Sequence, residues 1–352
     1  MEPVRVLEQL VAVPSHLRES EVQRLVSRLL ERCGFRVRLQ EVEPRRPNLV
    51  ATRGRGGPVL CTHVDTVPPF RHPRPFTLRR ARGRLVGRGA VDAKGQLAAA
   101  ITAAASAAGP VSIAVLVDEE GDGRGSQRVR LPPAARSGVL VLEPTAFAVC
   151  NEQAGYLDLE LVARGPGGHV AGRGDPGLFH QLVEAAERIG ALPILRSGRA
   201  RVGEPWFRIT GAQGGEDPWR LPGRARLRMQ LSVLPGASLD QVRETVEGLP
   251  LGPIRVRVAD AEPAVTSEGG EMLPALERAV LQLDGQVRRS LMTSWTDAAN
   301  LGARGYPWVV FGAGDLGPAH SDEEWIAEDD LRHLTEALAV LIEEWPNRAR
   351  AL

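Results

Sequence analysis

Three consecutive carboxylates follow an apolar run of the chain at the point where the run ends. Asp118, Glu119 and Glu120 come directly after 111–117, whose length and β-branched residues are typical of a buried parallel strand. The carboxyl ends of such strands open onto the ligand crevice of an α/β sheet. Like charges held together raise each other's pKa, so we expect a cation beside them. For this motif alone, a solvated acidic loop is the alternative.

The same pattern recurs elsewhere, which favours the active-site interpretation. Three more apolar runs end just before a histidine or a carboxylate: His63 and Asp65 after 58–61, Glu143 after 138–142, and His320 shortly after 307–311. Asp92 precedes an alanine-rich stretch, 96–108, with strong helix propensity. Histidine nitrogens combined with carboxylate oxygens suit zinc or a similar divalent ion. Five such ligands exceed one tetrahedral site, so they favour two metal ions that share a bridging carboxylate.

Composition limits the class of protein. A chain of 352 residues has room for two domains, and 43% hydrophobic with 25% charged residues is typical of a globular protein. A net charge of +1 argues against a nucleic-acid partner. Cys33, Cys61 and Cys150 are widely spaced without a CxxC pair, which predicts a reducing cytoplasm. No signal-peptide pattern and no stretch of membrane-spanning length is found, so we expect no membrane association.

The periodicity of apolar residues predicts two kinds of architecture. Helix and strand patterns alternate up to Glu143, which predicts an α/β domain with a mainly parallel sheet. Beyond about Cys150 the pattern changes. Three segments alternate apolar and polar residues with a period of two, as strands do: 156–163, 225–233 and 254–258. Two further segments, 178–189 and 238–249, have a helical pattern. The α/β pattern then returns and ends in a helix over 328–344. We predict a catalytic domain in two parts, 1–153 and 263–352, interrupted by a smaller α+β lid or dimerisation domain, 154–262.

Seven motifs give the chain a family resemblance. They run in order over most of the sequence: THVDTVP (62–68), GRGAVDAKGQLAA (87–99), VDEEGDGRGS (117–126), LEPT (142–145), RGPGGHVAG (164–172), TSWTDAANL (293–301) and GPAHSDEEWI (317–326). The chain resembles the family of acetylornithine deacetylase, succinyl-diaminopimelate desuccinylase, the lysine-releasing hydrolases and carboxypeptidase G-type enzymes. These are dinuclear zinc amidohydrolases of zinc-peptidase-like fold with an inserted lid. The sequences of these motifs favour the lysine- and ornithine-releasing branch of the family.

The resemblance implies a role for each matching residue. Two divalent metals, zinc with cobalt or manganese as alternatives, would have five ligands: Asp92 as the bridge, His63 and Glu143 on one side, Glu120 and His320 on the other. Asp65 would accept the second ring N–H of His63 and fix its tautomer. Glu119 would be the general base and then protonate the departing amine. His169 would reach the active site of a partner subunit and stabilise the oxyanion, which implies a homodimer.

The lid is where the chain departs from the family. Trp219 stands where an Asn is expected, and Ser232 stands where an Arg is expected to hold the substrate carboxylate. Arg220, Arg226 or Arg228 would have to substitute for that Arg, or the substrate lacks the carboxylate. Thr296 and Asp297, from the motif at 293–301, complete the candidate substrate-binding residues together with Arg220 and Arg228.

The sequence therefore favours hydrolysis of an N-acyl or peptide-type amide of an amino acid. Acetyl-ornithine, acetyl-lysine, and lysine or ornithine bound to an amino-group carrier protein are the first substrates to consider. A dipeptidase or exocarboxypeptidase of the same family is the alternative. A non-catalytic binding homologue is disfavoured, because all five ligand candidates and Glu119 are present.

Overall fold

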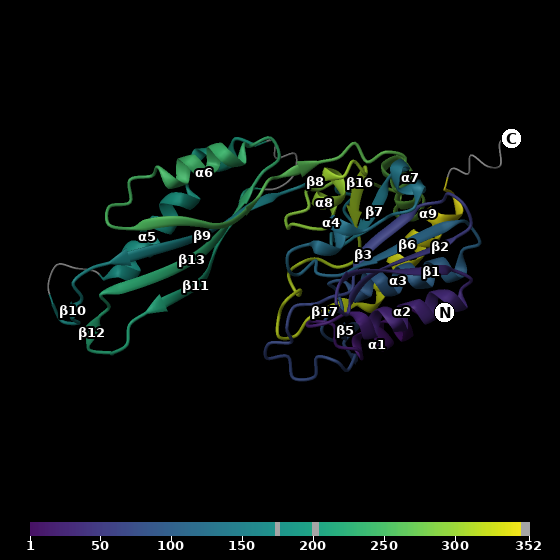
Figure 1. The fold of residues 1–352 in the computed structure, drawn as a ribbon, viewed down its shortest axis with the longest axis horizontal. Coiled ribbons are helices and arrows are strands. Elements are labelled where there is room, and N and C mark those ends of the chain that lie inside the picture. The colour runs from purple at the N-terminus through teal and green to yellow at the C-terminus, as the bar shows by residue number, and fades with distance from the viewer. Residues whose placement is uncertain (173–176, 199–203, 346–352) are drawn as a thin grey trace. The chain divides into compact units, whose positions relative to one another are not determined.

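The chain forms two compact units. A computed structural model describes residues 1–172, 177–198 and 204–345 (Figure 1). The main unit comprises Met1–Asn151, Ser267–Ser290 and the segment from Thr296 onward, and the inserted unit comprises Glu152–Thr266 with Leu291–Trp295. The sequence analysis predicted residues 291–295 to be in the second part of the catalytic domain, whereas in the structure they belong to the inserted unit. That 154–262 is a lid or dimerisation domain stays a prediction.

A six-stranded sheet forms the centre of the main unit. Its order is β1 (Arg36–Glu43), β2 (Arg46–Arg53), β6 (Val111–Leu116), β3 (Val59–His63), β7 (Val139–Leu142) and β16 (Trp308–Phe311). The last four strands are mutually parallel, while β1 and β2 add an antiparallel edge. Every residue of the parallel strands is buried, as expected when both faces of a sheet are covered. The predicted α/β class with a mainly parallel sheet is confirmed.

Helices and short strands complete the main unit. The helices are α1 (Pro3–Val11), α2 (Ser20–Arg32), α3 (Lys94–Ser106), α4 (Arg124–Arg128), a 3-10 turn (Pro133–Ser137), α7 (Met272–Asp284), α8 (Ala298–Ala303) and α9 (Glu328–Glu343). A small sheet of the main unit is β17-β5-β4 (Trp325–Ala327, Arg84–Val86, Arg79–Ala81), while the ladder β15-β8 (Val265–Thr266, Glu152–Gln153) belongs to the inserted unit. The alanine-rich helix α3 is buried from Lys94 through Ala104, because small side chains let α1 and α9 pack closely on it.

The inserted unit is an antiparallel sheet with helices. Its strand order is β11 (Phe207–Gly214), β13 (Arg224–Val233), β9 (Gly155–Arg164) and β14 (Arg255–Glu262). Buried and partly exposed residues alternate along β9, as expected for a sheet with one covered face. The core joins these strands to α5 (Leu178–Gly190) and α6 (Leu239–Glu247). A 3-10 turn (Pro193–Arg196) and the ladder β10-β12 (Gly168–His169, Arg220–Leu221) complete it.

No helix in the described parts of the chain combines the length and the apolar character needed to cross a bilayer.

Candidate active site

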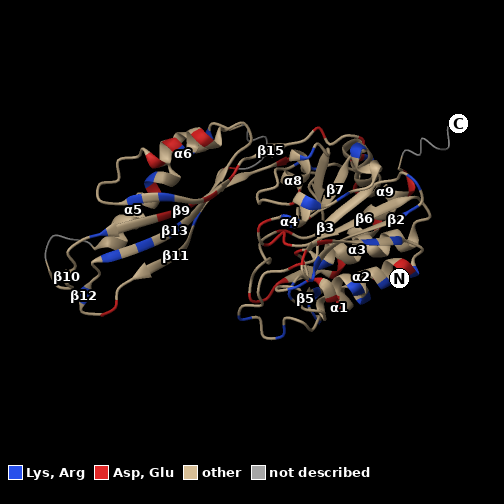
Figure 2. Ribbon diagram, viewed as in Figure 1, with Lys and Arg blue, Asp and Glu red and all other residues tan. Residues whose placement is uncertain are grey.

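The carboxyl ends of three neighbouring strands carry most of the predicted site residues. His63 is the last residue of β3, Glu143 directly follows β7, and Glu119 and Glu120 lie in the turn after β6. Because β6, β3 and β7 are adjacent and parallel, these ends meet at one edge of the sheet. Acidic residues accordingly gather on the loops beside β3 and α4 (Figure 2).

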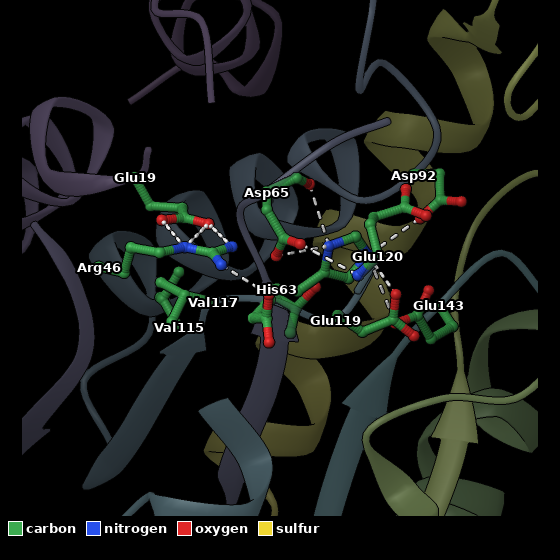
Figure 3. Close-up of polar contacts among 12 residues, drawn as sticks. Glu19, Arg46, His63, Asp65, Asp92, Val115, Val117, Glu119, Glu120 and Glu143 are labelled. Atoms are coloured by element: carbon green, nitrogen blue, oxygen red, sulfur yellow. Dashed lines mark hydrogen bonds and ion pairs between the residues drawn. The ribbon is translucent and has the colours of Figure 1, made fainter. Parts of the chain in front are cut away.

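Two groups of three side chains could each hold a metal ion. In each group the candidate ligand atoms lie within 4.8 Å of one another: His63, Asp92 and Glu143 in one, Asp92, Glu120 and His320 in the other. His63 Nε2 lies 3.0 Å from Asp92 Oδ1 and 3.7 Å from Glu143 Oε1. His320 Nε2 lies 3.3 Å from Asp92 Oδ2 and 3.1 Å from Glu120 Oε1. Asp92 therefore offers Oδ1 to the first group and Oδ2 to the second. Figure 3 shows Asp92 beside His63.

Asp65 sets the orientation of the His63 ring. His63 Nδ1 lies 3.1 Å from the Asp65 carbonyl oxygen and 3.5 Å from its Oδ1. Both neighbours are acceptors, so Nδ1 carries the proton and Nε2 is the ring atom available to a metal. The other Asp65 oxygen, Oδ2, accepts the backbone N–H of Glu120 at 3.0 Å. One carboxylate thus links the histidine of the first group to the turn that carries Glu120.

The protonation of these side chains is shifted by burial and by charge. Burial raises the pKa of Glu119 and of Glu143 well above the usual range, and neighbouring carboxylates add to the rise. Burial would lower the pKa of His63, but the charges of Glu143 and Glu119 raise it well above its usual value. Glu143 Oε1 is buried with no hydrogen-bond partner among the described residues. So many ionisable oxygens around two histidines fit a site built for cations.

Glu119 lies beside both groups and belongs to neither. Its Oε2 is 4.0 Å from His63 Nε2, and its side chain is 10% exposed. Neither candidate metal group includes Glu119, and unlike Asp65 it approaches the Nε2 side of His63, where the first group lies. A buried carboxylate of this kind is free to accept and release a proton.

Comparison with known proteins identifies the family. The sequence model of peptidase family M20/M25/M40 matches residues 59–344, which is most of the chain. The chain belongs to this family. The resemblance drawn from the seven motifs is thereby confirmed.

Relatives of the M20 chain include deacylating enzymes. It is 27% identical over 323 residues to N-acetyl-L-citrulline deacetylase of Xanthomonas campestris pv. campestris, with 88% of this chain and 87% of that protein covered. It is 29% identical over 308 residues to a candidate LysW-lysine/LysW-ornithine hydrolase of Pyrobaculum aerophilum, covering 84% and 85%. Human carnosine dipeptidase 1 has a similar fold, with a TM-score of 0.75 at 17% identity over 97% of this chain and 95% of that one.

One residue that positions the M20 site was not singled out from the sequence. Glu324, which is 1% exposed, accepts the backbone N–H groups of Gly89, Val91 and Asp92 at 2.9–3.1 Å. It is held in turn by Arg88, whose Nη1 lies 2.7 Å away. Glu324 therefore fixes the loop that presents Asp92. It lies inside a recognised motif, but its partners are more than two hundred residues distant, which the sequence does not reveal.

The candidate residues in the inserted unit of the M20 chain are exposed. His169 on β10 is directly opposite Arg220 on β12, so these two candidates are neighbours. The His169 Nδ1 accepts the Ala171 N–H at 3.1 Å, which leaves the proton of the neutral ring on Nε2. Arg228 lies in a different sheet, on β13 opposite Glu160, and is not brought next to His169.

The two departures from the family pattern have different environments. Ser232 is buried, and its Oγ accepts the Trp206 N–H at 2.9 Å, so it serves the packing of β13. Trp219 is 70% exposed and its carbonyl accepts the N–H of Val170, next to His169.

Thr296 and Asp297 lie in the main unit, at the start of α8, and each is 1% exposed. Burial raises the pKa of Asp297 to about 7. Because both residues are buried in the main unit, nothing in the structure shows them in contact with a substrate, and that role stays a prediction.

Proposed function

We propose that the chain is a metal-dependent hydrolase that cleaves an N-acyl or peptide-type amide of an amino acid. The observation that carries this function is the pair of metal-ligand groups that share Asp92, with Glu119 buried beside them. The deacetylase and the LysW hydrolase among the relatives favour release of an amino acid such as ornithine or lysine from an acyl group or a carrier protein.

We propose that two divalent ions, zinc above cobalt or manganese, are held by these residues. His63, Asp92 and Glu143 would hold one ion, and Asp92, Glu120 and His320 the other. Imidazole nitrogen with carboxylate oxygen is a donor set that zinc accepts, and the orphaned Glu143 Oε1 is a ready ligand atom. Such ions would lower the pKa of the attacking water and stabilise the negative charge that develops on the carbonyl oxygen.

Glu119 performs the proton transfers. It takes a proton from the water whose oxygen attacks the carbonyl carbon of the amide. It then gives that proton to the nitrogen as the C–N bond breaks, so an amine and a carboxylic acid form, and the acid loses its remaining proton to the amine or to water. Its burial beside other carboxylates raises its pKa, which suits a group that must hold a proton between the two steps.

We further propose that His169 and Arg220 act on the substrate from the inserted unit. The Nε2–H of His169 would donate to the tetrahedral oxyanion, and Arg220 beside it would bind a carboxylate of the substrate. In line with the family resemblance, the working form is a homodimer in which His169 of the partner subunit serves each site. The three free cysteines accord with the expected cytoplasmic location, which stays a prediction.

A substrate panel on metal-reconstituted protein tests the proposed function. It should contain N-acetyl-ornithine, N-acetyl-citrulline, N-acetyl-lysine, lysine or ornithine joined to a carrier protein through an amide, and dipeptides. We expect turnover of an acyl-amino acid or carrier conjugate, and a roughly 10²- to 10⁴-fold lower kcat for Glu119→Gln. Turnover of dipeptides alone would favour the dipeptidase alternative. Glu119→Gln protein with normal kcat and bound metal would overturn the proposed mechanism.

A further inference from the structure

A network of ionic contacts lies behind the turn that carries Glu119 and Glu120. Arg46, at the start of β2, donates from Nε and Nη2 to the Glu19 carboxylate at 2.5–3.1 Å. Its third nitrogen, Nη1, donates to Asp118 Oδ1 at 2.7 Å. The Glu19 side chain is fully buried, and that of Asp118 is 7% exposed. Figure 3 shows Glu19 and Arg46 on one side of Asp65 and His63.

Asp118 organises the turn by three further hydrogen bonds. Its carbonyl oxygen accepts the N–H of Gly121 at 3.4 Å and of Gly123 at 2.8 Å. Its Oδ2 accepts the N–H of Arg124 at 3.3 Å. The residue has φ +65°, a left-handed conformation that is uncommon outside glycine and needs support from its surroundings. Arg46 provides that support, because it holds the carboxylate around which the turn closes.

The turn is thus anchored on both sides of Glu119. Asp118 is tied to Arg46, and the Glu120 N–H is tied to Asp65. Asn48, two residues after Arg46 on β2, accepts the Val117 N–H at 3.2 Å and donates to the Gly125 carbonyl at 2.9 Å. Among the described residues, the polar contact of the Glu119 side chain is its approach to His63. Its position therefore follows from the positions of its two neighbours.

We propose that Arg46, held by Glu19, is a positioning residue that sets the place of Glu119 and Glu120 through Asp118. This inference rests on the proposed function, since it takes Glu119 as the proton carrier. Arg46 contacts no candidate metal ligand and touches no reacting atom. Its effect is geometric: a misplacement of about 1 Å at a reacting group can lower a rate roughly 10²-fold. Removing Arg46 alone would leave the buried Glu19 carboxylate unpaired and cost stability, so an effect on the turn must be separated from an effect on stability.

The experiment compares Arg46→Met, Arg46→Lys and Asp118→Asn with a control on the same strand. Arg53, at the other end of β2, donates to the carbonyl oxygens of Ala104, Ala107 and Gly109, and Arg53→Lys tests the loss of a structural arginine. Hydrogen exchange of the Gly121, Gly123 and Arg124 amides and kcat with KM are measured at saturating zinc, and zinc affinity is measured separately by titration of stripped protein.

We expect faster exchange in the turn and a kcat about tenfold to a hundredfold lower for Arg46→Met and Asp118→Asn, with KM within about twofold. Arg46→Lys should fall between these variants and the wild type, because lysine keeps the charge without the guanidinium fork. Zinc affinity should fall modestly through Glu120. Arg53→Lys should lower Tm while leaving exchange in the turn and kcat unchanged.

The inference would be overturned if Arg46→Met left both kcat and hydrogen exchange in the turn unchanged. It would also be overturned if the loss of kcat in Arg46→Met were explained by its lower Tm alone, as any loss in Arg53→Lys would be. If Arg46→Met does not fold, the near-isosteric Asp118→Asn decides by the same criteria. Glu119→Gln is measured in parallel. An active Glu119→Gln contradicts the proposed function, whereas an inactive Glu119→Gln beside a fully active Asp118→Asn contradicts only the role of Arg46.

Discussion

The two units of this chain hold their candidate functional residues in opposite ways. In the main unit His63, Asp92 and Glu143 are buried, and His63 and Asp92 are held by hydrogen bonds from separate segments of the chain. In the inserted unit His169 and Arg220 are exposed, on a ladder of two residue pairs. Burying charged groups is costly unless they pair with opposite charges or bind a cation. Under the proposed function, the main unit would supply the bond-breaking chemistry, and the exposed groups of the inserted unit would select the substrate.

The largest expected effect concerns the residue shared by both metal-ligand groups. Asp92→Asn should remove one charged ligand from two sites at once. Since a metal ion contributes several kcal/mol and each ~1.4 kcal/mol is tenfold in rate, kcat should fall at least about 10³-fold. Metal content by mass spectrometry should fall for both ions together. Loss of one ion with the other fully retained would show that Asp92 does not bridge.

The next effect tests whether the exposed unit takes part in the chemistry. His169→Ala should lower kcat by roughly 10²- to 10³-fold, as removal of an oxyanion donor does. Mixing His169→Ala protein with Glu119→Gln protein should restore activity, because one site of each mixed dimer then has both groups. Mixed dimers that form but stay inactive would place His169 and Glu119 of one active site in the same subunit, and full activity of His169→Ala would remove its proposed role.

A pH dependence of stability should distinguish the main unit when metal is stripped. Burial raises the pKa of Asp297 to about 7, and hydrogen bonds to Asp92 and Glu120 raise that of His320 to about 10. Both groups hold protons in the folded protein that the unfolded chain releases at lower pH, so stability falls as pH rises.

Between pH 5.5 and 8.5 the Tm of stripped protein should drop by several degrees, since one pKa unit is about 1.4 kcal/mol and 1 kcal/mol shifts Tm by about 2–4 °C. Most of this comes from the buried Asp297, because the His320 side chain is 49% exposed and its charge is screened by solvent. Added zinc should reduce this slope, because cations replace the protons. A Tm that rises over this pH range in stripped protein would contradict the assigned shifts.

The smallest effect separates the two candidate arginines of the inserted unit. Arg220 is next to His169 and Arg228 is not, so Arg220→Ala should raise KM about tenfold for a substrate that carries a carboxylate, consistent with the loss of ~1.4 kcal/mol. Arg228→Ala should leave KM within about twofold. Equal effects of the two variants would mean that the β10-β12 ladder does not mark the substrate site.

The metal-ligand candidates could be singled out from the sequence because their signal is local. An apolar run that stops at a His or a carboxylate marks the end of a buried strand, and parallel neighbours bring such ends together. The motifs added Asp92, which no strand end marks. The residues that hold these groups were harder to find, because Glu324 and Asp92, or Arg46 and Asp118, are distant in sequence and become neighbours only through the fold.

The inserted unit was predicted less completely for a physical reason. Strands β9 and β13 alternate between apolar and polar residues and were expected, whereas β11 was not. Its residues (FRITGAQG) are mostly exposed, so burial imposes no pattern that the sequence could reveal. The strand expected at 254–258 continues to Glu262 for a similar reason, since its polar end pairs with β9 through backbone hydrogen bonds.

The most direct test of the central claim is a crystal structure of zinc-loaded protein with anomalous diffraction at the zinc edge. We predict two peaks, one bounded by His63, Asp92 and Glu143 and the other by Asp92, Glu120 and His320, with one Asp92 oxygen on each ion. A single peak, or two peaks that do not share Asp92, would contradict the two-metal centre on which the proposed function depends.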